Sequence, residues 1–190
     1  MYEIVQTKRQ QKHFETTWEY FCNKYGWYND PYAENGNRYN LLLHKKGFCK
    51  RKKVIGTIEF IPYDPKNPQS TVETRFQFSK YDEIKLQQNR IWEIDKLCLH
   101  KDYQRKGYFH AFSHVLYDHI TKNEPKYYLA LIEKKFFRML KMMLGSVVEQ
   151  KGEALIGPTT ALIPTVFNIE KVMEDKERVN KLLTEYKIYS

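Results

Sequence analysis

The chain has 190 residues, of which 42% are hydrophobic and 15% aromatic, enough for one folded domain and too apolar for wholesale disorder. No apolar run approaches the roughly 20 residues that cross a bilayer, and the first residues lack the apolar stretch of a secretory signal. We therefore expect a soluble cytoplasmic protein with no membrane partner. Three cysteines, Cys22, Cys49 and Cys98, are an odd number without CxxC spacing, which argues against a disulfide framework or a zinc knuckle.

A formal net charge of +9 has two interpretations. It favours nucleic acid, or it serves a polyanionic small ligand or an acidic partner protein. The densest basic run, HKKGFCKRKK at 44–53, lies between two strand-like segments, and we expect a solvated hairpin tip there. No nucleic-acid-binding motif accompanies the run, so nucleic acid is the less favoured partner.

The first half of the chain begins with apolar residues at helical spacing, among them Phe14, Trp18 and Phe21, which predict a helix that Gly26 closes. The segment 71–89 is ambiguous, because its phenylalanines alternate with polar residues as in a strand, yet KYDEIKLQQN suits a loop or short helix. The elements expected in this half are the helix at 8–25, a turn-rich segment at 27–37, two antiparallel strands at 38–44 and 54–63, and a loop at 64–70.

The second half alternates strands and helices, with Phe109, Phe112, Leu116 and Ile120 on one helix face. An alternating second half after an antiparallel first half predicts one domain over 1–190 with a mixed sheet of α/β or α+β type. The expected elements are strand 91–99, helix 108–122, strand 126–132, helix 134–144, a strand near 161–167 and a helix over 169–187.

The most informative segment is 92–119, WEIDKLCLHKDYQRKGYFHAFSHVLYDH. It predicts a buried strand, a short polar loop and a helix opening at Gly107. Such a loop presents unpaired backbone N–H groups beside the positive end of the helix dipole, which suits an anion and most naturally a phosphate.

The loop sequence QRKGYF at 104–109 resembles the Q/R-x-x-G-x-G/A signature of the GNAT superfamily of acyl-CoA-dependent acyltransferases. The resemblance covers roughly residues 40–145 and includes the order of strands and helices. It implies a mixed, mostly antiparallel central sheet with a strand–loop–helix pyrophosphate site. By this resemblance the loop amides bind the coenzyme A pyrophosphate, and the residues implicated are Gln104, Arg105, Lys106, Gly107, Tyr108 and Phe109.

Phe109 departs from the signature, whose last position is normally glycine or alanine. Its ring either packs into the core with the apolar helix face or crowds the pyrophosphate.

The resemblance also assigns catalytic roles along the strand. Glu93 occupies the place of a general base in some members, acting directly or through a water, and is preferred over Asp95. Asp95 lies two residues on, hence on the same face unless a bulge intervenes. The alternative for both carboxylates is an ordinary polar face or salt bridges. The backbone N–H of Leu97 would support the thioester carbonyl, and Leu99 would flank the pantetheine arm.

Two further positions bear on the chemistry. Lys141 stands where the family commonly has a tyrosine that protonates the leaving thiolate, so another group serves or the thiolate leaves unassisted. His110, His114 and Asp118 share a helix face, but no fourth ligand is evident, so we expect a solvated face and no metal site.

These features lead to the hypothesis of an acyl-CoA-dependent N-acyltransferase. The expected donor is acetyl-CoA or another acyl-CoA, and the acceptor is the amine of a small molecule or peptide. One alternative is an enzyme that uses acyl carrier protein, similar to the acyl-homoserine-lactone synthases, which share the fold. The other is a GNAT-shaped binding module without catalysis. We expect acceptor selection in loops 27–37 and 64–90.

Overall fold

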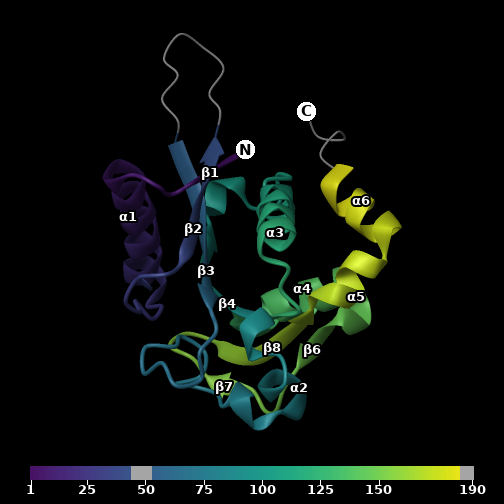
Figure 1. Ribbon diagram of the computed structural model, residues 1–190. Helices are drawn as coiled ribbons and strands as arrows, with labels where there is room; N and C mark the ends of the chain where they lie inside the picture. Colours follow the sequence, from purple (N-terminus) through teal and green to yellow (C-terminus); the bar gives the residue numbers. More distant parts are fainter. Residues whose placement is uncertain (44–52, 185–190) are drawn as a thin grey trace.

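A computed structural model describes residues 1–43 and 53–184 (Figure 1). The expected hairpin tip at 44–53 therefore lies almost wholly outside the described residues. The strands form one sheet in the order β1-β2-β3-β4-β5-β8-β6, and β7 pairs with β8. Every pairing is antiparallel except β4 with β5, so the mixed, mostly antiparallel sheet is confirmed.

The strands are β1 (Tyr2–Ile4), β2 (Asn37–Leu43), β3 (Lys53–Pro62), β4 (Ile91–Leu99), β5 (Tyr127–Glu133), β6 (Val148–Gln150), β7 (Leu155–Ile156) and β8 (Ala161–Asn168). The α-helices are α1 (Lys8–Tyr25), α2 (Asp82–Lys85), α3 (His110–Asn123), α4 (Lys134–Leu144), α5 (Ile169–Glu174) and α6 (Lys176–Thr184). None of the described helices combines the length and apolarity that a membrane crossing needs.

Helix α1 has clear local causes at both ends. Thr7 and Gln10 form a reciprocal capping box, which satisfies backbone N–H groups that the first turn leaves unpaired. Gly26 ends the helix with φ of 64°, a left-handed conformation in which glycine has no Cβ penalty. The predicted boundaries of this helix are confirmed.

The two faces of the sheet carry different layers (Figure 1). Helices α3 to α6 lie on one face, around a core that includes Phe112, Tyr128 and Leu140. Helix α1 and the segment 63–90 cover the other face, where Trp18 and Phe78 are buried. Each central strand is therefore buried on both sides, and alternate residues point to different layers.

Strands β4 and β5 run together only briefly. Their parallel pairing covers Ile91–Glu93 of β4 and Tyr127–Leu129 of β5, although both strands continue beyond it. On its other side β4 is bulged, since Thr57 of β3 faces Cys98 and Glu59 faces Asp95. One residue of β3, Ile58, thus lies opposite two of β4, Lys96 and Leu97, which leaves the bulged residues without ladder partners.

Lys96 forms this bulge with φ of 49°, an uncommon conformation for a residue with a side chain. Its wholly buried ammonium lies 2.8 Å from Glu59 Oε2 and 2.7 Å from Asp95 Oδ2, and donates to the Pro31 carbonyl at 3.2 Å. Burial alone lowers the pKa of Lys96, but Asp95 and Glu59 outweigh it and raise that pKa above its ordinary value. The ammonium therefore stays charged and anchors the bulge.

Two expectations differ from the structure, and the ambiguous segment takes one of its two alternatives. Helix α3 begins at His110 rather than near Gly107, because the preceding residues form turns. The segment 71–89 contains turns and short helices rather than a strand, since Phe76 and Phe78 both pack into one cluster. The C-terminal helix is broken at Asp175 into α5 and α6. Strands β1, β6 and β7 have two or three residues each, too few to show a periodic pattern.

We predict that Lys96→Met lowers the free energy of unfolding by about 3–5 kcal/mol, because it leaves buried Glu59 short of a counter-charge. Lys122→Met, which removes an exposed pair with Asp118, should cost less than about 1 kcal/mol. Urea unfolding at neutral pH measures both values. Equal, small losses in the two variants would contradict the anchoring role of Lys96.

Candidate active site

The loop before α3 keeps its amides available. Arg105 and Gly107 have φ of 59° and 78°, so the chain turns sharply at both. Among the described residues, the backbone N–H groups of 105–109 donate no hydrogen bond to the protein. They precede α3 directly, where the helix dipole adds positive potential. The arrangement is a nest of donors suited to an anion.

Two side chains define the loop further. Gln104 donates from Nε2 to the Leu99 carbonyl at 2.9 Å and so fastens the loop to the end of β4. At Gly107 a Cβ would meet nothing within 4 Å, so its positive φ rather than crowding favours glycine, and the space beside it is open. Arg105 and Lys106 are exposed in the same turn and add charge suited to phosphate.

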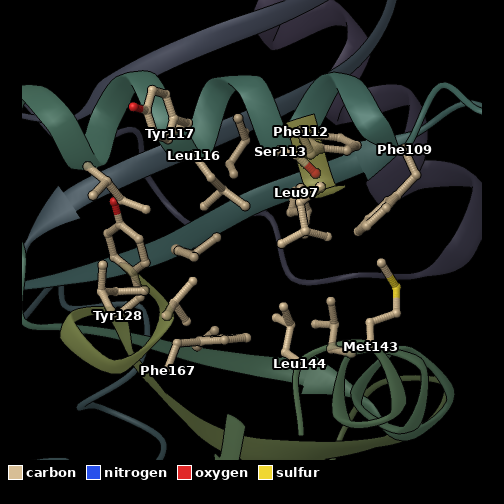
Figure 2. A pocket seen from close by; sticks show the side chains of 18 of the residues that line it. Leu97, Phe109, Phe112, Ser113, Leu116, Tyr117, Tyr128, Met143, Leu144 and Phe167 are labelled. Atoms are coloured by element: carbon tan, nitrogen blue, oxygen red, sulfur yellow. The ribbon is translucent and has the colours of Figure 1, made fainter. Parts of the chain in front are cut away.

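An apolar cavity of about 130 Å³ lies between the parted strands and the helices α3 to α6 (Figure 2). Leu97 of β4 and Phe109 of the loop both line it, so the cavity reaches from the bulge to the unpaired amides. Hydroxyl groups enter its lining at Ser113, Tyr117 and Tyr128. The remaining lining is hydrocarbon, which suits an aliphatic ligand.

The Tyr128 hydroxyl is already engaged, since it lies 2.7 Å from Nδ1 of His119. Burial lowers the pKa of His119 to about 4, so its ring is neutral at physiological pH. The ring stacks on Phe60 at 4.0 Å between centroids and meets Trp92 edge-on. These rings pack together where β4 and β5 are still paired, at Trp92 and Tyr128.

The structure resolves the two alternatives for Phe109. Its ring points into the cavity (Figure 2) and lies 5.7 Å from both Phe112 and Phe136 between centroids. The side chain therefore packs into the core and leaves the outer side of the loop clear.

Glu93 is held by Ser70 and Thr71, at the end of the 64–70 loop. One carboxylate oxygen accepts from Ser70 Oγ at 2.6 Å, and the other accepts from Thr71 N and Oγ1, each at 2.9 Å. Burial raises the pKa of Glu93 to about 7, although the hydrogen bonds from Ser70 and Thr71 oppose this rise. A carboxyl that titrates near neutrality is suited to proton transfer, but its side chain touches protein on every polar atom.

Asp95 shares the face of Glu93, because the bulge follows it rather than intervening. Its side chain is 19% exposed and paired with Lys96, whereas Glu93 is 1% exposed. Both carboxylates lie on the α1 face of the sheet. Leu97, the second bulge residue, lies on the cavity side. The site is thus divided between the two faces.

The two leucines of β4 differ. In the described ladders Leu97 has no partner residue on β3 or β5, so its N–H is placed to support a thioester carbonyl. Leu99 pairs with Gly56 and is absent from the cavity lining, so the structure does not bring it to the site.

Lys141 and the helix face with His110, His114 and Asp118 lie outside this candidate site. Lys141 donates from Nζ to the Val148 carbonyl at 2.7 Å, outside the cavity lining, which places it with β6 rather than with a leaving thiolate. Asp118 pairs with Lys122, and His110 and His114 bring their Nε2 atoms within 2.9 Å. The described part of the chain holds no group of three metal-ligating side chains.

Sequence reasoning missed Ser70, Thr71, Arg75 and Asp30 as site residues. Thr71 connects Glu93 to the last two of these residues, because the Thr71 carbonyl accepts from Arg75, whose guanidinium pairs with Asp30. A carboxylate in a buried strand needs donors, and the Ser70–Thr71 pair, where the 64–70 loop meets the ambiguous segment, was the signal available.

Neither a family model nor a curated protein sequence matches this chain. Solved structures do resemble it. FeeM, an N-acyl amino acid synthase from uncultured soil microbes, superposes with a TM-score of 0.67 at 12% identity, over 90% of this chain and 91% of its own. The CoA-dependent acyl-homoserine lactone synthase BjaI gives 0.62 at 14% identity, over 100% and 90%. A GNAT-family acetyltransferase from Staphylococcus aureus gives 0.54 at 10% identity, over 89% and 99%.

The chain has the GNAT fold. The mixed, mostly antiparallel sheet expected from the sequence belongs to this fold. The apolar cavity and the buried Lys96 of the bulge are described from the residues of this chain and not from the comparison.

We predict that Glu93→Gln changes the pH dependence of stability. Because the folded-state pKa of Glu93 is raised from 4.5 to about 7, its contribution to stability is fully present below pH 4.5 and is lost as pH rises through 7. The free energy of unfolding of Glu93→Gln, relative to wild type, should therefore increase between pH 5 and 8. Urea unfolding at these pH values measures the difference, with exposed Glu153→Gln as control. A difference independent of pH would contradict the raised pKa.

Proposed function

We propose that this chain is an acyltransferase that moves an acyl group from a thioester, coenzyme A in the first instance, to an amine. One observation carries the proposal: a single apolar cavity is lined by both the bulge residue Leu97 and the loop residue Phe109. A thioester whose diphosphate rests on the loop would place its carbonyl near Leu97 and its acyl chain in the cavity. The two synthases of similar fold are both named for acyl products, which supports this class of reaction.

The residues fit coenzyme A as donor. The amides of 105–109, which donate no hydrogen bond within the described residues, and the charges of Arg105 and Lys106 suit its diphosphate, and the N–H of Leu97, a bulge residue without a ladder partner among the described strands, suits the thioester oxygen. The arm between these two ends would follow the gap in which β4 and β5 part. Binding of coenzyme A by these amides and basic side chains needs no metal ion.

The cavity favours an acyl chain longer than acetyl. Its lining is hydrocarbon on β4, β5 and α3, and helices α5 and α6 extend it with Met173, Val179 and Leu182. An acetyl group would leave most of this surface without contacts, whereas each buried methylene contributes about 0.8 kcal/mol. We therefore propose a medium or long acyl chain in place of the acetyl group expected from the sequence.

The reaction forms a C–N bond between the amine and the thioester carbon and breaks the C–S bond, whose electron pair leaves on sulfur. The amine must first lose a proton, and we propose Glu93 as its final acceptor, reached through the hydroxyl of Ser70 or Thr71. The Leu97 N–H would hold the oxyanion. The thiolate has a low intrinsic pKa and can leave unassisted, consistent with Lys141 lying elsewhere.

An acyl carrier protein is the second candidate donor. Exposed Lys134, Lys135 and Arg138 line α4, which follows β5 directly, and such a protein would meet them with acidic side chains. Turnover of acyl carrier protein but not of acyl-CoA would select this donor. Donor binding without transfer to any amine would instead identify a binding module.

We predict that Gly107→Asp weakens octanoyl-CoA binding at least about tenfold, or about 1.4 kcal/mol, because it brings a carboxylate beside the diphosphate amides. Gly26→Asp is a matched control, since Gly26 has a similar φ of 64° and lies at the end of α1. Calorimetric titration gives both affinities. Equal affinities in wild type and Gly107→Asp would exclude the loop as the diphosphate site.

We predict that Leu116→Trp shortens the acyl chain that the enzyme accepts. Leu116 points into the cavity from α3 (Figure 2), and a larger ring there removes space for distal methylenes. The ratio of kcat/KM for decanoyl-CoA to that for butyryl-CoA should fall at least about tenfold, whereas Leu86→Trp, at a 78% exposed position, should not change it. A thiol-release assay over acyl-CoA lengths tests this, and an unchanged ratio would remove the chain from the cavity.

A further inference from the structure

The face of the sheet opposite the apolar cavity carries a second hollow, whose mostly apolar lining includes one charged side chain, Arg75. It is open, measures about 330 Å³, and is lined by Tyr28, Arg75, Leu155, Ile156 and Leu162. These residues come from the 27–37 loop, the segment after Thr71, and the β7–β8 pair. Segments far apart in sequence thus build one concave surface.

Hydrogen bonds and strand pairing connect the hollow to both of the strands, β4 and β5, between which the gap opens. On the β4 side, Arg75 donates to the Thr71 carbonyl at 2.8 Å, and Thr71 in turn donates to Glu93, the last β4 residue paired with β5. On the β5 side, Leu162 pairs with Glu133 at the far end of that strand. A ligand in the hollow would therefore approach the gap from the face opposite the acyl chain.

Charges of both signs are fixed at this hollow. The Arg75 guanidinium lies 2.7 Å from Asp30 Oδ1 and 4.2 Å from the centre of the Tyr28 ring. Burial acts to lower the pKa of Arg75, but Asp30 and Asp95 raise it above its ordinary value, so both carboxylates act on this guanidinium. Arg75 and Asp30 remain 24% and 25% exposed and can still reach a ligand.

Arg75 also has donors to spare. A guanidinium has five N–H groups, and within the described chain the hydrogen bonds of Arg75 go to Thr71 and Asp30 only. Its planar fork suits a carboxylate, whereas Asp30 and Asp95 suit an ammonium. Tyr28 and Leu162 offer apolar contact to a side chain beside these charges.

We propose that this hollow binds the acyl acceptor, and that the acceptor is a free amino acid with an apolar or aromatic side chain. The proposal rests on the acyltransferase function proposed above and names its second substrate. The carboxylate would be held by Arg75, and the amine would lie toward Asp95 and the gap. After proton loss toward Glu93, the amine would attack the thioester carbon across that gap.

The test compares acceptors that differ only by a carboxylate. Phenylalanine with phenethylamine, and leucine with isopentylamine, are assayed with octanoyl-CoA by thiol release and by mass spectrometry of the amide. We expect each amino acid to exceed its amine at least about tenfold in kcat/KM. Arg75→Met should raise the KM for the amino acids at least about tenfold, with little change for the amines, and Arg75→Lys should restore part of the preference.

Arg90→Met is the matched control. Arg90 likewise donates to a backbone carbonyl, that of Glu124, and pairs with a carboxylate, that of Glu170, but it lies away from the hollow. It should leave both kinetic constants unchanged. Thermal unfolding checks that Arg75→Met is folded.

The outcomes separate the two proposals. If octanoyl-CoA does not bind and octanoyl carrier protein is not turned over either, the acyltransferase function itself fails. If octanoyl-CoA binds and amines without a carboxylate react as well as amino acids, the acceptor class is wrong and the acyltransferase function stands. An equal loss for all acceptors in Arg75→Met, without rescue by Arg75→Lys, would reduce Arg75 to a structural role and overturn its part in recognition.

Discussion

The site depends on one buried ammonium. Lys96 holds a left-handed backbone conformation that costs free energy for a residue with a side chain, and its contacts with Glu59, Asp95 and the Pro31 carbonyl stabilise it there. The bulge that results shifts the side chains that follow it along β4. Leu97 consequently turns toward the cavity with no ladder partner, while Asp95 stays on the opposite face. The buried ammonium of Lys96 on the α1 face thereby determines where the Leu97 N–H could bind a thioester carbonyl on the cavity face.

The same strand separates two environments that the proposed reaction needs. An acyl chain requires a dry, apolar surface, and an amine that must lose its proton requires fixed polar groups. Here hydrocarbon lines the α3 side, while Glu93, Asp95 and Arg75 lie on the α1 side. Because β4 and β5 separate after Glu93, the two environments meet only where the strands part. Neither substrate would then need to enter the surroundings of the other.

Much of this architecture could be predicted from sequence, and the limits have physical causes. Strong periodicity and cap residues fixed α1 and α4, and the strand–loop–helix pattern located the amide loop. The bulge had no such signal, because the adjacent polar residues Asp95 and Lys96 interrupt the alternation of β4 without showing which face each side chain takes. The contacts of Glu93 with Ser70 and Thr71 were equally hidden, since they join positions more than 20 residues apart across an ambiguous segment. Local patterns report local structure, and the polar half of this site is built from non-local contacts.

The departure at Phe109 fits the apolar cavity better than the family pattern would. A small residue in this place would leave the end of the cavity beside the loop without a wall, whereas the phenyl ring packs against Phe112 and Phe136 and closes it with hydrocarbon. The ring lies on the inner side, so the loop amides keep their outer side clear. Since a buried aromatic ring also contributes to core stability, the loop before α3 is held by packing at its last residue and by Gln104 at its first. An anion site built from a flexible turn would pay an ordering cost on binding, and fastening both ends of this turn reduces that cost.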